Sequence, residues 1–169
     1  MSEDANPGRV EIRDAQPDDL HAVQRVARTT WDHTYRDNIP ERVREEFVSR
    51  AYSADSLRLR MGSNVFLVAL QDSNIVGFAD FRPLSQTEVE LAAIYVIPGM
   101  QGQGIGGRLF EAGGERFPSD TTFVLRVERD NAPALRFYEA RGFRISGEFE
   151  EGLFGHEFHD VEMVLDSGS

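Results

Sequence analysis

Apolar and polar residues along the chain follow two periods, one typical of strands and one typical of helices. The segments NVFLVALQ (64–71) and NIVGFADF (74–81) are largely apolar, and the polar stretch between them predicts an antiparallel hairpin. After Pro17, apolar side chains instead recur every three or four residues, which predicts an amphipathic helix. The predicted strands are 9–15, 64–71, 74–81, 88–98, 122–128, 143–149 and 158–165, and the predicted helices lie within 17–31, 40–60 (broken near Tyr52 and Ser53), 102–117 and 131–141.

The order of these elements predicts one mixed α/β domain. Helices 102–117 and 131–141 are each expected to join a pair of parallel strands, with antiparallel pairs elsewhere. A chain of 169 residues can bury a substantial core as one unit, and no repeat or linker interrupts it. We therefore expect a single domain over 9–165, with loosely ordered tails at 1–8 and 166–169.

The composition excludes several kinds of chemistry. The chain has no cysteine, so disulfides, a thiolate nucleophile and a cysteine-based zinc site are excluded. Its four histidines are scattered and show no ligand spacing, so no metal site is expected. No apolar run approaches the ~20 residues that cross a membrane, and the N-terminal stretch is acidic and polar, unlike a signal peptide. These features predict a cytoplasmic protein that does not act at a membrane.

The charge balance is strongly acidic and free of lysine. Asp and Glu total 29 against 18 basic residues, all of them arginine, and the net charge is -11. An acidic surface attracts cationic partners, but an acidic, lysine-free composition also suits a protein adapted to a saline environment. Because the absence of lysine is a property of the whole chain, we favour the environmental interpretation. The same charge argues against a general nucleic-acid-binding protein, which needs a basic surface.

The stretch MQGQGIGGRL (100–109) crowds glycine where a helix is expected to begin. Gly102, Gly104 and Gly107 satisfy G-x-G-x-x-G, which leaves backbone N–H groups free to hold phosphate at a helix N-terminus. As a dinucleotide fingerprint the match is weak, because a Rossmann domain usually begins with this unit, which here starts about 100 residues into the chain. A merely flexible loop is disfavoured, because Ile105 and Leu109 commit the segment to a packed helix. The pattern therefore predicts a pyrophosphate ligand.

The same stretch resembles the signature of the GNAT superfamily of N-acetyltransferases, which bind acetyl-CoA. Residues 101–106 match the family pattern Q/R-x-x-G-x-G/A, and NAPALRFYEARGF (131–143) resembles N-x-x-A-x-x-F-Y-x-x-x-G-F. The similarity extends more loosely over 9–165. It implies the family's fold, a central twisted mixed sheet with flanking helices in which strands 88–98 and 122–128 splay apart.

The resemblance implies roles for residues along the acetyl-CoA molecule. Backbone N–H groups of 101–107 would hold its pyrophosphate, and the pantetheine arm would run beside 94–96 in the gap between the splayed strands. A bulge in strand 88–98 would aim a backbone amide at the thioester carbonyl. Asn131 would hydrogen-bond the pantetheine, although asparagine is also a preferred helix cap. The implied acetyl-CoA-binding residues are Ile94, Tyr95, Val96, Gln101, Gly102, Gln103, Gly104, Ile105, Gly106, Gly107, Asn131, Ala134, Phe137 and Tyr138.

The resemblance also implies two catalytic residues. Tyr138 would be the general acid for departing CoA, and ordinary phenol and thiol pKa values of about 10 and 8.5 favour a hydrogen bond to the forming thiolate over full proton donation. A core tyrosine following Phe137 is the structural alternative. Glu90, eleven residues before Gln101, matches the glutamate that serves as base in some family members. To act as a base, Glu90 would need a raised pKa or a water molecule that relays the proton. Glu88 could serve as the base in its place. The structural alternative is that Glu90 is only a half-exposed carboxylate on a strand.

Acceptor recognition would come from the region around Trp31 and Tyr35 and from the last two strands. Trp31 also continues the apolar stripe of its helix, and the acidic segment 147–160 could attract a cationic amine or be one more acidic loop. Together these features predict an enzyme that moves acetyl from acetyl-CoA directly to a primary amine of a small molecule or peptide. A non-catalytic acyl-CoA-binding or sensor domain is the alternative, and a nucleotide-binding Rossmann-like domain is a distant third. The resemblance also allows a homodimer.

Overall fold

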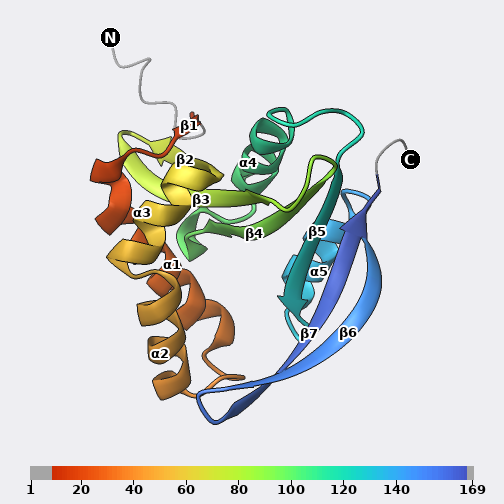
Figure 1. Ribbon diagram of the computed structural model, residues 1–169. Coiled ribbons are helices and arrows are strands. Elements are labelled where there is room, and N and C mark those ends of the chain that lie inside the picture. Colours follow the sequence, from red (N-terminus) through yellow and green to blue (C-terminus); the bar gives the residue numbers. More distant parts are fainter. Residues whose placement is uncertain (1–8, 167–169) are drawn as a thin grey trace.

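One mixed sheet of seven strands forms the frame of the molecule (Figure 1), in the order β1-β2-β3-β4-β5-β7-β6. The computed structural model describes residues 9–166. The strands are β1 (Glu11–Asp14), β2 (Val65–Gln71), β3 (Asn74–Pro83), β4 (Glu88–Val96), β5 (Thr122–Glu128), β6 (Arg144–Leu153) and β7 (His156–Leu165). The α-helices are α1 (Leu20–Tyr35), α2 (Glu41–Ala51), α3 (Ala54–Ser63), α4 (Ile105–Gly114) and α5 (Ala132–Glu139), and short 3-10 turns lie at η1 (Pro17–Asp19) and η2 (Pro98–Met100). The predicted mixed α/β fold is confirmed.

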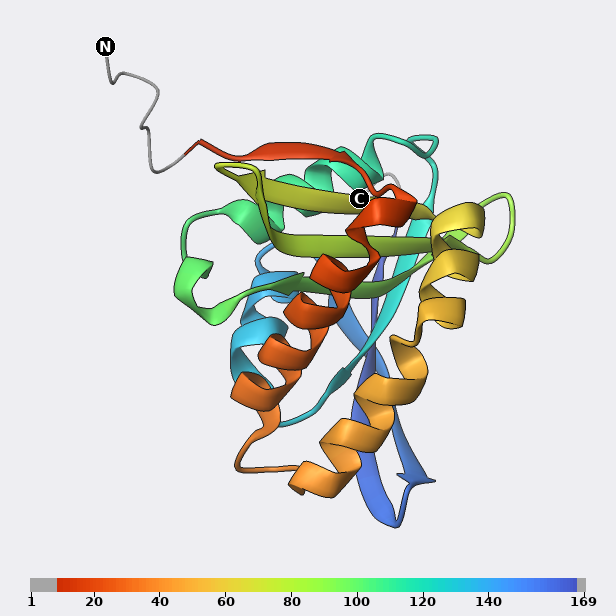
Figure 2. The same cartoon turned by 90° about the vertical axis from the view of Figure 1, so that its left-hand side faces the viewer.

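Helices cover both faces of the β1–β4 half of the sheet, which explains the nearly continuous apolar run of β2. Phe66 and Val68 pack with α1, α2 and α3 on one face, whereas Leu67 and Ala69 pack on the other face, which α4 covers. All four side chains are buried. Figure 2 looks onto the face that carries α1, α2 and α3. Burial from both sides removes the alternating polar positions that a half-exposed strand keeps.

β4 and β5 are parallel neighbours at one end only. Their ladder joins 88–90 to 122–124, and no further pair between them follows among the described residues. β4 also carries a bulge at Ala92, which has no partner in β3 although the residues on both sides of it do. Beyond the bulge the two strands run apart, as Figure 1 shows. The predicted splay of these strands is confirmed.

β7 lies between β5 and β6, although α5 connects β5 to β6 along the chain. The predicted parallel pair of β5 with the strand that follows it is therefore wrong, and residues 123–128 pair antiparallel with β7 instead. Burial accounts for this order, because β7 buries Phe158, Val161 and Met163 whereas β6 is exposed along most of its length. The more apolar strand takes the inner place and the more polar strand takes the edge.

Local capping decides where two helices begin. The predicted break near Tyr52 separates α2 from α3, and the Ser53 hydroxyl caps α3 by accepting a hydrogen bond from the Ser56 amide at 3.1 Å. α4 begins at Ile105 instead of at the predicted 102, because two of the glycines before it have positive φ values and form a turn.

The structure tests only one residue of the predicted loose tails at the two chain ends. The predicted tails at 1–8 and 167–169 lie outside the described residues. Asp166, which was assigned to a loose tail, forms an ion pair with Arg144 at 2.8 Å. No helix within residues 9–166 is long and apolar enough to cross a membrane.

Candidate active site

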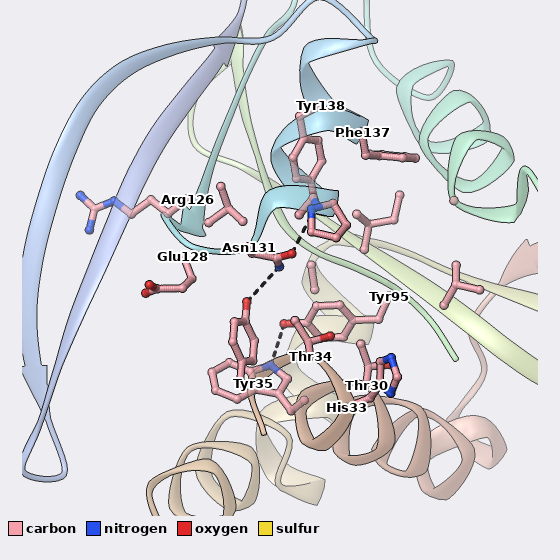
Figure 3. A pocket seen from close by; sticks show the side chains of 18 of the residues that line it. Thr30, His33, Thr34, Tyr35, Tyr95, Arg126, Glu128, Asn131, Phe137 and Tyr138 are labelled. Carbon is pink, nitrogen blue, oxygen red and sulfur yellow. Dashed lines mark hydrogen bonds between the residues drawn. The ribbon is translucent and has the colours of Figure 1, made fainter. Parts of the chain in front are cut away.

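The diverging halves of β4 and β5 open into a cavity of about 950 Å³, called the main cavity below (Figure 3). Residues of α1, β4, α4, β5, α5 and the β6–β7 hairpin line it. The predicted site residues that line it are Trp31, Tyr35, Ile94, Tyr95, Val96, Gln101, Gly102, Gly104, Ile105, Gly106, Gly107, Asn131, Ala134, Phe137 and Tyr138. Gln103, Glu88 and Glu90 are not among its lining residues. One cavity thus gathers most of the predicted site from distant parts of the chain.

The glycine turn before α4 leaves open space beside backbone N–H groups. Gly102 and Gly104 have φ values of 82° and 80°, in the left-handed region that glycine adopts without strain. A Cβ at either position would meet no described atom within 4 Å. The first N–H groups of α4 have no partner inside the helix, and the helix dipole adds positive potential there. This turn is therefore able to hold a phosphate group.

Arg141 brings a positive charge to this turn that the sequence reasoning missed. Its guanidinium lies 3.7 Å from the centre of the Phe137 ring, and its Nη1 donates to the Phe137 carbonyl at 3.1 Å. A Cβ at Gly107 would collide with Nη2 of Arg141, and a Cβ at Gly106 would approach the Phe137 ring to 3.2 Å. These two glycines therefore allow α4 to lie against the end of α5. The four-residue spacing of Phe137 and Arg141 was the signal that could have found this contact.

Gln101 and Asn131 fix the segments on either side of the gap. The Gln101 Nε2 donates to the Val96 carbonyl at 3.0 Å and ties the glycine turn to the end of β4. The Asn131 Oδ1 accepts from the Ala134 amide at 3.3 Å, which is the helix cap that the sequence offered as the alternative role. Its Nδ2 donates to the Tyr35 hydroxyl at 3.3 Å (Figure 3). Asn131 therefore links α5 to α1 across the main cavity.

Tyr138 is a buried residue whose hydroxyl has no hydrogen-bond partner among the described residues. The residue is 8% exposed, and its ring centre lies 5.2 Å from that of Phe137 and 5.5 Å from that of Phe143. Burial raises the pKa of this hydroxyl well above its usual value, and negative charge on Tyr95 or Tyr35 would raise it further. The hydroxyl therefore stays protonated near neutral pH and is able to donate a hydrogen bond.

Trp31 combines a core position with a contact in the main cavity. Its ring stacks on Phe47 with ring centres 4.2 Å apart, as its place on the apolar stripe of α1 predicts. Its Nε1 donates to the Tyr95 hydroxyl at 3.0 Å, which orients the Tyr95 side chain (Figure 3). Trp31 is therefore part of the cavity wall and also holds the Tyr95 side chain in place.

Glu88 and Glu90 lie where β4 and β5 are still paired, outside the main cavity. The Glu90 carboxylate accepts a hydrogen bond from the Arg82 Nε at 3.0 Å. Both glutamates line a separate depression of about 390 Å³. Because they precede the bulge in β4, the structure does not bring the predicted base together with Tyr138.

Three carboxylates form an acidic wall of the main cavity, defined here as Glu128, Glu151 and Asp160. Burial raises the pKa of Asp160, and the charges of Glu128 and Glu151 raise it further. Burial also raises the pKa of Tyr35, with Glu128 and Asp160 among the contributing charges. The sequence had indicated Glu151 and Asp160 only as members of an acidic segment, and Glu128 was missed. Within residues 9–166, no group of three or more His, Asp or Glu side chains is placed to hold a metal ion.

A gap between parallel strands with a phosphate-binding turn at one end is suited to a long ligand that ends in a pyrophosphate-linked group. Residues 23–143 match the Acetyltransferase (GNAT) family. The chain is 28% identical to the spermidine N(1)-acetyltransferase of Thermoplasma acidophilum, over 80% of this chain and 89% of that relative. It is 30% identical to the peptidyl-lysine N-acetyltransferase YiaC of Escherichia coli, over 79% and 83%.

A solved structure agrees with these relatives. The PaiA N-acetyltransferase of Thermoplasma acidophilum, in complex with coenzyme A, superposes with a TM-score of 0.80 at 25% identity, covering 94% of this chain and 99% of that one. The chain belongs to the GNAT acetyltransferase family. It is an N-acetyltransferase that uses acetyl-CoA and an amine acceptor, and the alternative of a non-catalytic binding domain is not favoured.

Proposed function

We propose that acetyl-CoA lies in the gap between β4 and β5, with its pyrophosphate at the glycine turn and its thioester beside Ala92. The divergence of the strands beyond 88–90 and 122–124 carries this proposal. It leaves backbone groups of 94–96 without ladder partners in β5, so an extended pantetheine arm can hydrogen-bond to them as an added strand would. The open space beside Gly102 and Gly104 fits the phosphates, and Arg141 supplies a counter-charge.

The bulge at Ala92 supplies the group that stabilises developing charge. Ala92 is exposed and lines the main cavity. A bulge re-aims the backbone of a strand, and here it directs an amide N–H toward the thioester carbonyl oxygen. Such a donor is held in place by the sheet before the reaction begins, so no reorganisation is needed when the oxygen becomes negative.

Acetyl-CoA supplies the thioester carbonyl and the thiolate leaving group. The acceptor nitrogen forms the new C–N bond, the C–S bond breaks, and its electron pair stays on sulfur. The Tyr138 hydroxyl donates a hydrogen bond to that sulfur, because burial keeps it protonated. The acceptor loses its proton to water, since Glu90 pairs with Arg82 outside the main cavity.

The acceptor is a primary amine of a small molecule or peptide that enters beside Tyr35 and the acidic wall. The relatives named for spermidine and for peptidyl-lysine support this range. An amine with a pKa near 10.4 is mostly protonated at neutral pH, so the rate should rise with pH as the free amine becomes available.

The test is release of free CoA when acetyl-CoA meets a panel of primary amines, with mass spectrometry to detect the acetylated product. Release that depends on the amine is expected. CoA binding with no release for any amine would identify a sensor, and binding of NAD in place of CoA would overturn the assignment of the site.

The setting of the enzyme is part of the same proposal. We place it in the cytoplasm, acting on amines as a homodimer and not on nucleic acid, and the net charge of -11 supports the exclusion of nucleic acid. The lysine-free acidic composition supports a saline environment. Sedimentation at several protein concentrations tests the dimer.

A further inference from the structure

A buried ion pair lies beside the bulge of β4. Asp80 of β3 is completely buried, and its Oδ2 accepts a hydrogen bond from the Arg60 Nε at 2.8 Å. Its Oδ1 accepts a second bond from the Asn64 Nδ2 at 2.7 Å. Asp80 is the ladder partner of Ala93, the residue that directly follows the bulge at Ala92. The end of α3 therefore holds the β3 residue at which β4 changes register.

The Arg60 side chain is held on several sides, which keeps the ion pair in one geometry. Its guanidinium carbon lies 4.7 Å from the centre of the Tyr52 ring and 5.9 Å from that of the Phe66 ring. Its Nη1 donates to the Ala51 carbonyl at the end of α2. Neither Arg60 nor Asp80 is among the lining residues of the main cavity. The pair therefore acts on the site only through the residues that it holds.

Stability alone does not account for a buried ion pair. Taking two charges out of water costs about as much as their attraction returns, and apolar side chains of similar volume are often as stable in the same place. The best-attested use of a buried polar group is to fix the register of neighbouring elements. It favours one arrangement because the others leave a polar group or charge buried without a partner.

β4 needs a constraint of this kind, because its own residue types do not specify where it bulges. Ala92 and Ala93 are identical neighbours, and exchanging their places would leave the other pairs with β3 unchanged, including that of Leu91 with Phe81. The two arrangements differ in the direction of the backbone, since consecutive residues of a strand point to opposite sides. The ion pair of Asp80 fixes the backbone of β3 directly opposite this choice.

We propose that Arg60 and Asp80 are positioning residues for acetyl transfer, because their ion pair fixes the bulge of β4 at Ala92 and so aims the backbone amide at the thioester carbonyl. This inference rests on the proposed acetyl transfer, in which that amide stabilises the developing charge. Without the pair, the bulge is shared between Ala92 and Ala93, and only one of the two arrangements is active. CoA binding does not depend on the choice, because β4 keeps its register from Ile94 onward.

A double variant removes the pair without leaving a buried charge. Arg60→Met/Asp80→Leu makes the place apolar, and the half-buried Asn64 is able to turn toward water. We measure kcat with acetyl-CoA and 1-aminobutane, and the Kd of CoA by calorimetry. A misplacement on the order of 1 Å costs about 10²-fold, so kcat should fall at least about tenfold while the Kd and the Tm remain close to those of the wild type. Arg60→Lys keeps a cation for the single contact with Asp80 and should recover most of kcat.

NMR of the enzyme–CoA complex, with isotope labelling of alanine alone, gives a readout that does not need turnover. The amides of Ala92 and Ala93 should each give one signal in the wild type and in Arg60→Lys. In the double variant, each should give two signals or one signal broadened by exchange. Arg13→Met/Asp19→Asn is the matched control, because this pair, at 2.7 Å and with the carboxylate side chain 10% exposed, lies outside the main cavity. Its kcat and its alanine signals should equal those of the wild type.

Several results would overturn the positioning role while leaving acetyl transfer intact. They are wild-type kcat in the folded double variant, single and unchanged alanine signals in that variant, and a double variant that loses folding or CoA binding as much as it loses turnover. In the last case the pair would be only structural. A wild type that acetylates no amine would instead overturn the proposed transfer, and the alanine signals would still decide whether the pair fixes the bulge.

Discussion

Tyr138→Phe removes the hydroxyl that we assign to departing CoA and leaves the ring in place. The ring packs against Phe137 and Phe143, and no hydrogen bond to the hydroxyl exists among residues 9–166. We therefore expect no loss of Tm and no change in CoA affinity. A fixed donor to developing charge contributes about 2.7–4 kcal/mol, and the lower end, about 10²-fold in kcat, suits a sulfur that spreads its charge over a large atom.

The pH dependence follows from the raised pKa of Tyr138. An acid is active while protonated, so its contribution is lost as pH rises through its pKa. Because that pKa lies above the ordinary value of about 10, wild-type kcat should show no loss from Tyr138 ionisation up to about pH 10. Release of the CoA thiol at saturating substrates measures kcat, and independence of kcat from solvent viscosity shows that chemistry limits the rate.

Tyr52→Phe is the control for loss of a buried phenol, because Tyr52 is 4% exposed and does not itself line the main cavity, although it contacts the cavity residue Tyr95. Its kcat should remain that of the wild type, even if its Tm falls. If Tyr138→Phe turns over at the wild-type rate while chemistry limits, the hydroxyl does not assist the departure of CoA and the backbone contacts carry the reaction.

Three further predictions address the phosphate site, the glutamates of β4 and the net charge. Gly104→Val should weaken CoA binding about 10²-fold, since its φ of 80° disfavours a β-branched residue and the side chain would enter the space for phosphate. Gly114→Ala is its control in a titration, and unchanged CoA affinity in a folded Gly104→Val would refute the phosphate site. Glu90→Gln should leave kcat/KM unchanged from pH 6 to 9, and a selective loss at low pH would show that Glu90 is the base after all. Raising KCl from 0.1 to 1 M shortens the screening length from about 10 to about 3 Å and should raise the Tm of a chain with net charge -11, whereas a lower Tm would contradict dominant self-repulsion.

The periods of apolar residues were sufficient to predict the seven strands, including β6, which is exposed along most of its length. They could not predict the order of the last two strands, which depends on a comparison of burial between β6 and β7. Both segments are amphipathic when read alone, so the sequence does not reveal which of the two strands lies next to β5. The hairpin turn at Phe154 and Gly155, both with positive φ, reverses the chain and allows the more apolar strand to lie next to β5.

The phosphate turn could be predicted from glycine spacing because it is local. The acidic wall could not, since Glu128 and Asp160 come together only through the register of β5 on β7, 32 residues apart in the chain. Arg141 was missed for a similar reason, because its position beside Gly107 depends on the packing of α5 against α4. Glu90 shows the opposite case. Its spacing from Gln101 matched that of the base in some family members, but the main cavity opens beyond the part of β4 in which Glu90 lies.

The bulge at Ala92 explains both the success and the failure of the sequence reading along β4. In a regular strand, residues two positions apart lie on the same face, yet Leu91 packs with the α4 side and Ala93 with the α1 side. One extra residue therefore changes the face of everything that follows. It turns Tyr95 toward Trp31 and leaves Glu90 in the regular, paired part of the strand. The segment LAAIYV is small or apolar throughout, so its residue types cannot reveal the change of face. Ala92 forms the bulge to which we assign the catalytic backbone amide, and the same bulge separates the predicted base, Glu90, from the main cavity.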